Sequence, residues 1–342
     1  MGIARPGMAW IPAGVLRAGT PVDRVPRLAD EEPPGTELTL GGFYIDLYPF
    51  PNEAGAIPTS NVTREDAAHL CEGKGKRLCS ELEWERSCKG AGNFTYEYGD
   101  QYHAATCSTG VTVEEAAKRP SGERLGCKSG FGVMDLHGGP WEWTDSAWKR
   151  GTKGELGVLR GGNALAGELV GRCANGIGRR LASKGPTMGF RCCAGPRNPA
   201  EVTIEAKPSI ALERSMKPGD LASPFLAMAS QKWGGDAGVS FAASQAWTWR
   251  PAANEELVIV SGCAASSDGF GKIPATCGVL VGRVSPGAAT SISEIDAGRS
   301  LSEVVMFGDA RHLRMMGKDA RGPFVRQITY VYGRIELGEI KR

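Results

Sequence analysis

The sequence predicts an α+β chain of two domains: a loop-rich domain over residues 1–198 and a mainly β domain of sandwich or jelly-roll type over residues 199–342. The length supports two domains, because 342 residues exceed the usual size of one. Glycine and proline are dense in the first part of the chain, which contains few helix signals. After residues 195–199, tryptophan and cysteine become sparser and runs of β-branched residues appear, so we place the linker there.

Two short helices are predicted in the first domain from their capping residues. Each begins with a hydroxyl residue that is followed three positions later by a carboxylate, which is the capping-box pattern, and each ends at a glycine. The helices are expected over residues 63–73, starting with Thr63 and Asp66, and over residues 80–90, starting with Ser80 and Glu83. Short strands are expected over residues 38–47 and 158–160, and the rest of this domain consists of turns and irregular backbone.

In the second domain, strand-like runs follow one another with glycine, asparagine, aspartate and proline between them, and no amphipathic helix is expected. The runs are Val202 to Ile204, Leu257 to Val260, Val279 to Val284, Val304 to Phe307 and Val325 to Tyr332. This pattern predicts an all-β domain. Cys263 and Cys277 flank a turn-rich segment between two of these strands, so a disulfide between them would tie a hairpin.

Charge and hydropathy exclude two classes of partner. The chain has 40 basic and 38 acidic side chains, a net charge of +2, and therefore lacks the strong positive field that nucleic acid binding requires. No window has the 18 or so uninterrupted apolar residues of a membrane span. The first ten residues lack the order of a signal peptide, so an exported protein would already have lost its signal, and the sequence leaves open whether a lipid anchor was trimmed.

The ten cysteines indicate an oxidising compartment. No C-x-x-C motif occurs, and the four histidines are scattered, so a structural zinc site is not predicted. An even number of cysteines in a glycine- and proline-rich chain is typical of a disulfide-stapled fold. We therefore expect an extracytoplasmic protein, whether periplasmic, surface-anchored or secreted.

A series of short motifs occurs in the first domain in a characteristic order. The motifs are Met8-Ala-Trp-Ile-Pro-Ala-Gly14, Phe43-Tyr-Ile-Asp46, the stretch from Cys71 to Glu85 that ends in Glu-Leu-Glu-Trp-Glu, Phe131-Gly-Val-Met-Asp-Leu-His-Gly-Gly-Pro-Trp-Glu-Trp-Thr144, Leu159-Arg-Gly-Gly-Asn163 and Gly189-Phe-Arg-Cys192. This order resembles that of the formylglycine-generating enzymes, or sulfatase-modifying factors. The resemblance spans roughly residues 8–195. It implies a compact, loop-rich relative of the C-type-lectin-like fold.

The resemblance also implies a disulfide pattern. Family members commonly carry two structural disulfides, whose positions here correspond to Cys71 with Cys192 and Cys88 with Cys173. A bridge between Cys79, which replaces the family's usual proline, and Cys193 is reasonable because their neighbours are already joined. Cys107 and Cys127 then form the remaining pair in this domain.

The family's enzymes use a pair of cysteines five residues apart, shortly after the Arg-Gly-Gly motif, to bind copper and direct oxygen to a substrate cysteine. This chain has no cysteine between Gly162 and Cys173. Copper(I) requires soft thiolate ligands, which Ala166 and Glu168 cannot provide. We therefore expect no copper at this position and no oxidation of a substrate cysteine by the family's route.

Calcium is the family's other cofactor, and one of its sites involves the motif that contains Glu142. The family's asparagine is replaced here by glycine, so Glu142 is the remaining candidate calcium ligand, and the alternative is a carboxylate satisfied by backbone amides or by an arginine. The arginines from Arg172 to Arg180, with Arg191, suggest an anion or peptide-carboxylate site, although structural ion pairs are the commoner role. The candidate groove residues are Glu142, Arg160, Asn163, Glu168 and Arg180.

These observations favour a non-catalytic, extracytoplasmic binding or scaffold protein with a protein or peptide partner. One alternative is an oxidoreductase or maturation enzyme of the same family that uses the five groove candidates in place of cysteines. Another is a structural component of a cell-envelope assembly. The sequence leaves the ligand and the role of the second domain open.

Overall fold

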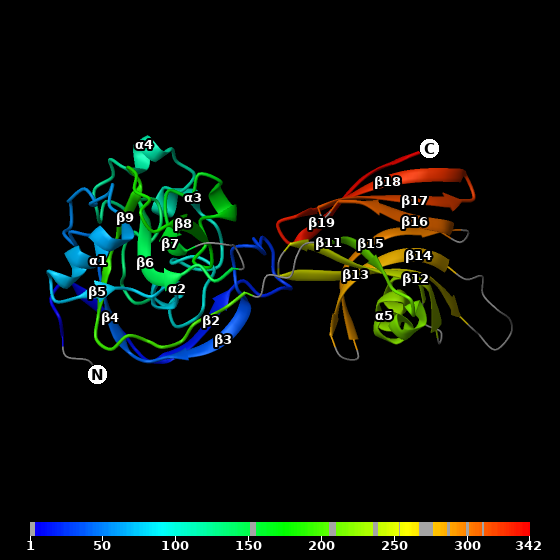
Figure 1. The fold of residues 1–342 in the computed structure, drawn as a ribbon, viewed down its shortest axis with the longest axis horizontal. Coiled ribbons are helices and arrows are strands. Elements are labelled where there is room, and N and C mark those ends of the chain that lie inside the picture. The colour runs from blue at the N-terminus through cyan, green and yellow to red at the C-terminus, as the bar shows by residue number, and fades with distance from the viewer. Residues whose placement is uncertain are drawn as a thin grey trace. The chain divides into compact units, whose positions relative to one another are not determined.

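The computed structural model describes residues 4–150, 155–204, 210–234, 239–252, 254–266, 276–285, 288–298, 301–309 and 311–342. The chain divides into two compact units, Met1–Glu205 and Ala206–Arg342 (Figure 1). The division lies beyond the boundary predicted at residue 198, because the following residues pack on the first unit. Asn198 Nδ2 donates to Glu83 Oε1 at 2.9 Å, and the buried Ile204 donates its N–H to the Lys149 carbonyl at 3.0 Å. The strand predicted for Val202 to Ile204 does not form.

The two predicted helices of the first unit are confirmed. Helix α1 (Arg64–Glu72) is capped by Thr63, and helix α2 (Glu81–Lys89) is capped by Ser80. Both N-termini form the reciprocal capping box, which satisfies backbone N–H groups that a helix leaves unpaired. Every residue of α2 is buried, although five of its nine side chains are charged. Those charges therefore need partners inside the unit.

The strands of the first unit form two four-stranded sheets and a hairpin. The first sheet has the order β1 (Met8–Ile11), β4 (Phe43–Asp46), β10 (Cys192–Ala194), β5 (Arg77–Leu78), and the second has the order β8 (Gly176–Arg180), β7 (Leu156–Gly161), β6 (Trp141–Ala147), β9 (Met188–Phe190). The hairpin pairs β2 (Gly14–Gly19) with β3 (Pro34–Leu40), and the short helices α3 (Ala104–Cys107), α4 (Val113–Ala116) and the 3-10 turn η1 (Gly167–Leu169) interrupt the loops. The strand expected over residues 38–47 is divided between the end of β3 and β4, and the strand expected over residues 158–160 lies within β7.

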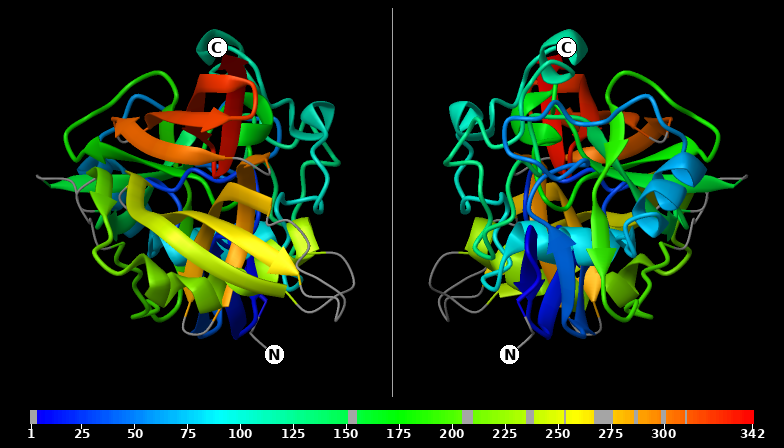
Figure 2. Two further views of the ribbon diagram at one scale, coloured as in Figure 1. Left: turned by 90° about the vertical axis from the view of Figure 1, so that its right-hand side faces the viewer. Right: turned by 90° about the vertical axis from the view of Figure 1, so that its left-hand side faces the viewer.

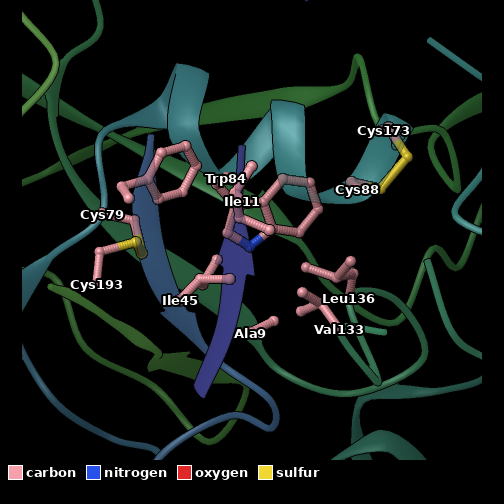
Figure 3. Close-up of a cluster of buried hydrophobic side chains, with 11 residues drawn as sticks. Ala9, Ile11, Ile45, Cys79, Trp84, Cys88, Val133, Leu136, Cys173 and Cys193 are labelled. Carbon is pink, nitrogen blue, oxygen red and sulfur yellow. A yellow bond between two sulfur atoms is a disulfide. The ribbon is translucent and has the colours of Figure 1, made fainter. Parts of the chain in front are cut away.

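Trp84 of α2 is central to one core of this unit. It is fully buried in a cluster with side chains of β1 and β4 and of the loop that contains Val133 and Leu136. Figure 3 shows Trp84 beside Ile11 and Leu136, with the Cys88–Cys173 bridge at the end of the same cluster. Helix, sheet and loop are thus joined through one aromatic side chain and one covalent bond.

All ten cysteines form disulfides, and the five pairings expected from the sequence are confirmed. They are Cys71–Cys192, Cys79–Cys193, Cys88–Cys173, Cys107–Cys127 and Cys263–Cys277. The first three close segments of 121, 114 and 85 residues, so each could stabilise the unit by about 4–5 kcal/mol through the entropy of the unfolded chain. Cys263 and Cys277 are directly paired residues of neighbouring strands, as the hairpin interpretation requires.

The second unit contains two antiparallel sheets in which each strand pairs with the next one in the chain. One sheet comprises β11 (Ile210–Arg214), β12 (Val239–Ala252), β13 (Glu255–Ser266), β14 (Thr276–Ser285) and β15 (Ala288–Gly298), and the other comprises β16 (Ser302–Gly308), β17 (His312–Asp319), β18 (Gly322–Val331) and β19 (Arg334–Lys341). The orange-to-red strands of the second sheet are visible together in Figure 2. This sequential pairing lacks the crossing connections of a jelly roll, so that alternative is wrong.

Strands β12 to β14 are covered on both faces. On one face the paired residues Ala246, Val260 and Leu280 pack beneath helix α5 (Ala222–Ala229). On the other face Trp249 contacts Tyr330 of β18, with ring centroids 6.2 Å apart. The expectation of no helix in this part of the chain is therefore wrong. Helix α5 lacks a side-chain cap and is mostly apolar, so neither helix signal was present.

No helix within the described part of the chain is long and apolar enough to cross a membrane.

Residues 199–204 are predicted to be an integral part of the first unit. A fragment ending at residue 198 loses the buried Ile204, with Ala200 and Val202 that pack on the β2–β3 core, which costs about 2 kcal/mol. We expect its melting temperature to be about 4–8 °C below that of a fragment ending at residue 205. Calorimetry of the two fragments measures this difference, and equal melting temperatures would place the boundary at residue 198 after all.

Candidate functional site

Glu142 is the second residue of β6 and is completely buried. Its Oε2 accepts hydrogen bonds from Trp84 Nε1 at 2.7 Å and from Arg191 Nε at 2.6 Å, and its Oε1 accepts from Arg191 Nη2 at 2.8 Å. Of the two roles that the sequence left open, Glu142 thus has the arginine partner. A calcium ion at Glu142 would have to displace this guanidinium, so calcium binding there stays a prediction from the sequence.

Arg160 is also fully buried, on β7 next to Glu142. Its Nη2 donates to Glu81 at 2.6 Å and to Glu85 at 3.1 Å, and its Nη1 donates to backbone carbonyls of residues 173–175. Burial alone would raise the pKa of Glu81, but Arg150 and Arg160 lower it below its usual range. Because the folded-state pKa is lowered, this contribution to stability is present at neutral pH and is lost as the pH falls. Arg160 is therefore a structural ion-pair partner and does not line a groove.

The remaining groove candidates are separated by burial. Asn163 is 5% exposed, and its Nδ2 donates to the Val111 carbonyl at 2.7 Å, which anchors the start of the loop that follows β7. Glu168 and Arg180 are exposed. The structure therefore does not bring the five candidates together in one open site: three are enclosed and two lie on the surface.

The arginines proposed as an anion site are likewise divided between the interior and the surface of the unit. Arg172 donates to both carboxylate oxygens of Glu32, and Arg191 pairs with Glu142, and both guanidiniums are buried. Arg179 and Arg180 are exposed, and neither forms an ion pair within the described residues. A buried guanidinium requires an anionic partner, so the first two belong to the core and only the last two can meet a ligand.

A pocket of about 70 Å³ lies between the β2–β3 turn and α2. Two cations in its wall are Lys89 and Arg172, but neither has a donor to spare. Lys89 donates to two backbone carbonyls and pairs with Glu85 at 2.8 Å. Arg172 bonds Thr20, Glu32 and the Leu169 carbonyl. These two buried cations are paired with carboxylates and offer the pocket no free hydrogen-bond donor.

Sequence reasoning missed one buried polar cluster. His137 Nδ1 lies 3.0 Å from Glu97 Oε2, and Glu97 Oε1 lies 3.1 Å and 3.4 Å from the sulfur atoms of Cys107 and Cys127. Both groups of potential metal ligands within the described residues contain Glu97 with two cysteines, and in each group the cysteines are joined as a disulfide. Disulfide sulfur is not a thiolate ligand, so this cluster has no ready metal site. The local sequences, Tyr96-Glu97-Tyr98 and Leu136-His137-Gly138, contain no motif from which the contact between Glu97 and His137 could have been predicted.

Removing the charge of Glu142 should strongly destabilise the first unit. In Glu142→Gln the buried Arg191 loses its anionic partner, which costs about 3–5 kcal/mol. The matched control Glu168→Gln changes an exposed side chain and should stay within about 0.5 kcal/mol of the parent protein. Urea unfolding followed by tryptophan fluorescence measures both, and similar free energies of unfolding for the two variants would contradict a stabilising role of the pair.

Comparison with known proteins identifies sequence relatives of the first unit. The family model of the sulfatase-modifying factor enzyme 1-like domain matches residues 51–195. Formylglycine-generating enzyme of Mus musculus is 28% identical over 163 residues, which cover 40% of this chain and 44% of that protein. Inactive C-alpha-formylglycine-generating enzyme 2 of Bos taurus is 26% identical over 162 residues, which cover 42% of this chain and 52% of that protein. The chain spans about half the length of the curated relatives it matches.

Similar solved structures include PvdO from Pseudomonas aeruginosa, with 23% identity, a TM-score of 0.44 and coverage of 54% of this chain and 93% of that one. The structure of CarF has 14% identity, a TM-score of 0.39 and coverage of 54% and 97%. From the family model and the sequence relatives, we conclude that residues 51–195, within the first unit, form a sulfatase-modifying factor enzyme 1-like domain that is similar to the formylglycine-generating enzymes.

Proposed function

We propose that the chain is a non-catalytic, extracytoplasmic binding or scaffold protein built on a domain of this family. The observation that carries the proposal is that all ten cysteines are joined in disulfides. A copper(I) site of the family's kind needs two thiolates, and the loop over residues 163–172 has no sulfur to contribute. The site that would supply the family's chemistry is therefore missing, whereas the scaffold is kept.

The interior supports the same proposal. Glu142 and Arg160, which the enzyme alternative would use, have their polar atoms directed to Arg191, Glu81 and Glu85. A catalytic group must reach its substrate within hydrogen-bond distance, and these groups are 0% exposed. The enzyme alternative would thus depend on Glu168 and Arg180 alone.

Five disulfides fit a protein that matures in an oxidising compartment, and we extend this to a periplasmic, surface-anchored or secreted location. We also propose the C-type-lectin-like fold for the first unit and a sandwich for the second. On this view the first unit presents loops and strand edges to a protein or peptide partner. Participation in a cell-envelope assembly is one form that such scaffolding could take.

The proposal predicts that the protein does not oxidise a substrate cysteine. Purified protein is loaded with copper(I), supplied with oxygen and a mild thiol reductant, and incubated with a sulfatase-type Cys-x-Pro-x-Arg peptide. The peptide mass should stay unchanged, because no pair of thiolates holds copper near the peptide. An active formylglycine-generating enzyme in a parallel reaction provides the positive control. Conversion of the peptide thiol to an aldehyde by this chain would refute the non-catalytic reading.

A further inference from the structure

Strand β8 (Gly176–Arg180) is an open edge of the sheet β8–β7–β6–β9. It pairs on one side with β7, and no described strand pairs with its other side. Outside the ladder with β7, the backbone–backbone hydrogen bonds of these five residues within the described chain are limited to the Arg180 carbonyl, which accepts from Ser183. An open edge of this kind can accept a further strand.

Two adjacent cations stand on this edge. Arg179 and Arg180 are exposed, and neither forms an ion pair within the described part of the chain. Arg179 donates only to the neighbouring Gly178 carbonyl, at 2.9 Å. Some other arginines near the surface of this unit are compensated, as Arg64 and Arg197 are by Asp145, whereas Arg24 and Arg124 are exposed and form no ion pair within the described residues either. The edge of β8 therefore carries two positive charges that the rest of the unit leaves unbalanced.

The two arginines project to opposite faces of the sheet. Successive side chains of a strand alternate, so Arg180 shares a face with Gly178, whose missing side chain would meet the Trp148 ring at 2.8 Å. Arg179 is paired in register with Gly157, whose missing side chain would meet the Trp143 ring at 3.1 Å on the other face. One guanidinium thus flanks the open edge above the sheet and the other flanks it below.

We propose that the edge of β8 binds an extended peptide segment with two consecutive acidic residues, which adds to the sheet as a further strand. Backbone groups of β8 pair with the segment, and its alternating side chains place one carboxylate beside Arg179 and the next beside Arg180. This inference rests on the proposed binding function and names the partner's chemistry.

The geometry distinguishes this ligand from other anions. A single phosphate or carboxylate would need both guanidiniums to converge on one point, whereas these two diverge to opposite faces of a sheet. A nucleic acid would need a broad positive field, and the chain has a net charge of only +2. An extended polypeptide places charges alternately on both faces, as the edge requires.

Fluorescence anisotropy with labelled peptides tests the proposal on the full-length protein. One peptide has two adjacent glutamates between valine and threonine residues, and a second has the same composition with the glutamates one residue apart, so that both lie on one face. We expect the first to bind at least fivefold more tightly. A version of the first peptide with N-methylated central amides should lose most of its binding, because it cannot form the ladder. Equal binding of all three would overturn the strand-addition model.

Variants locate the site. The double variant Arg179→Glu with Arg180→Glu should weaken binding of the adjacent-glutamate peptide at least tenfold and should gain affinity for a peptide with adjacent lysines. The single variants should each lose part of the binding. Arg24→Glu is the control, because Arg24 is another exposed arginine of the same unit. Equal melting temperatures for parent and variants would establish that the fold is retained.

The outcomes separate this inference from the proposed function. If Arg24→Glu weakens binding as much as the change of Arg179 and Arg180, the attraction is non-specific and the β8 site is refuted, while the non-catalytic assignment stands. If the protein instead converts the sulfatase-type peptide, the proposed function fails independently of what the edge of β8 binds.

Discussion

The guanidinium of Arg191 is the contact on which the first unit depends. It bonds both carboxylate oxygens of Glu142 and four backbone carbonyls, those of residues 46, 47, 134 and 135. The next two residues along the chain, Cys192 and Cys193, are bridged to Cys71 at the end of α1 and to Cys79 just before α2. The short segment 191–193 near the end of the unit therefore ties together β4, β6, α1 and the loop before β6, which explains how a unit with so little regular structure keeps a defined core.

The same contact limits what the interior can do. Glu142 is shared between Arg191 and the indole of Trp84, and Arg160 is shared between two glutamates of α2. Each of these groups has several partners, and removing one partner leaves a buried charge without its full compensation in a medium of low dielectric constant. Such a network stabilises a single arrangement. It is poorly suited to proton transfer or to reversible binding of an ion, both of which require a group to change its partners.

Much of the first unit could be predicted because its signals are local or sequence-specific. The Thr63 and Ser80 capping boxes define two helices, and the family's cysteine positions define the disulfides. The roles of Glu142 and Arg160 could not be predicted, because a motif identifies a carboxylate or a guanidinium but not whether it is buried against a partner. The resemblance also could not separate an exposed Arg180 from a buried Arg191 in the same arginine-rich segment.

The second unit was harder to predict for a different reason. Strands β13 and β14 are buried on both faces, so their apolar runs lack the alternation of a half-exposed strand, and the helix that covers one face, α5, is itself apolar and has no capping residue. By contrast β17 alternates between exposed and buried residues along its length. Alternation of exposed and buried residues therefore identifies a strand of the sheet β16–β19. The sheet on which α5 packs could be recognised only from contacts between residues far apart in the chain.

Because the charged groups of the interior are paired with one another, a partner can be bound only by groups on the surface. There the positions of the side chains matter more than the total charge of the unit. The unit buries arginines with matched carboxylates and compensates several exposed ones, so its net field is weak and cannot select a partner by attraction alone. Selectivity must then come from the spacing of the few uncompensated groups relative to available backbone. At β8 the alternation of the strand fixes two guanidiniums on opposite faces, and the rigid ladder with β7 holds them there without further ordering cost. A unit held together by disulfides and buried ion pairs is thus compatible with binding that depends on the direction of side chains.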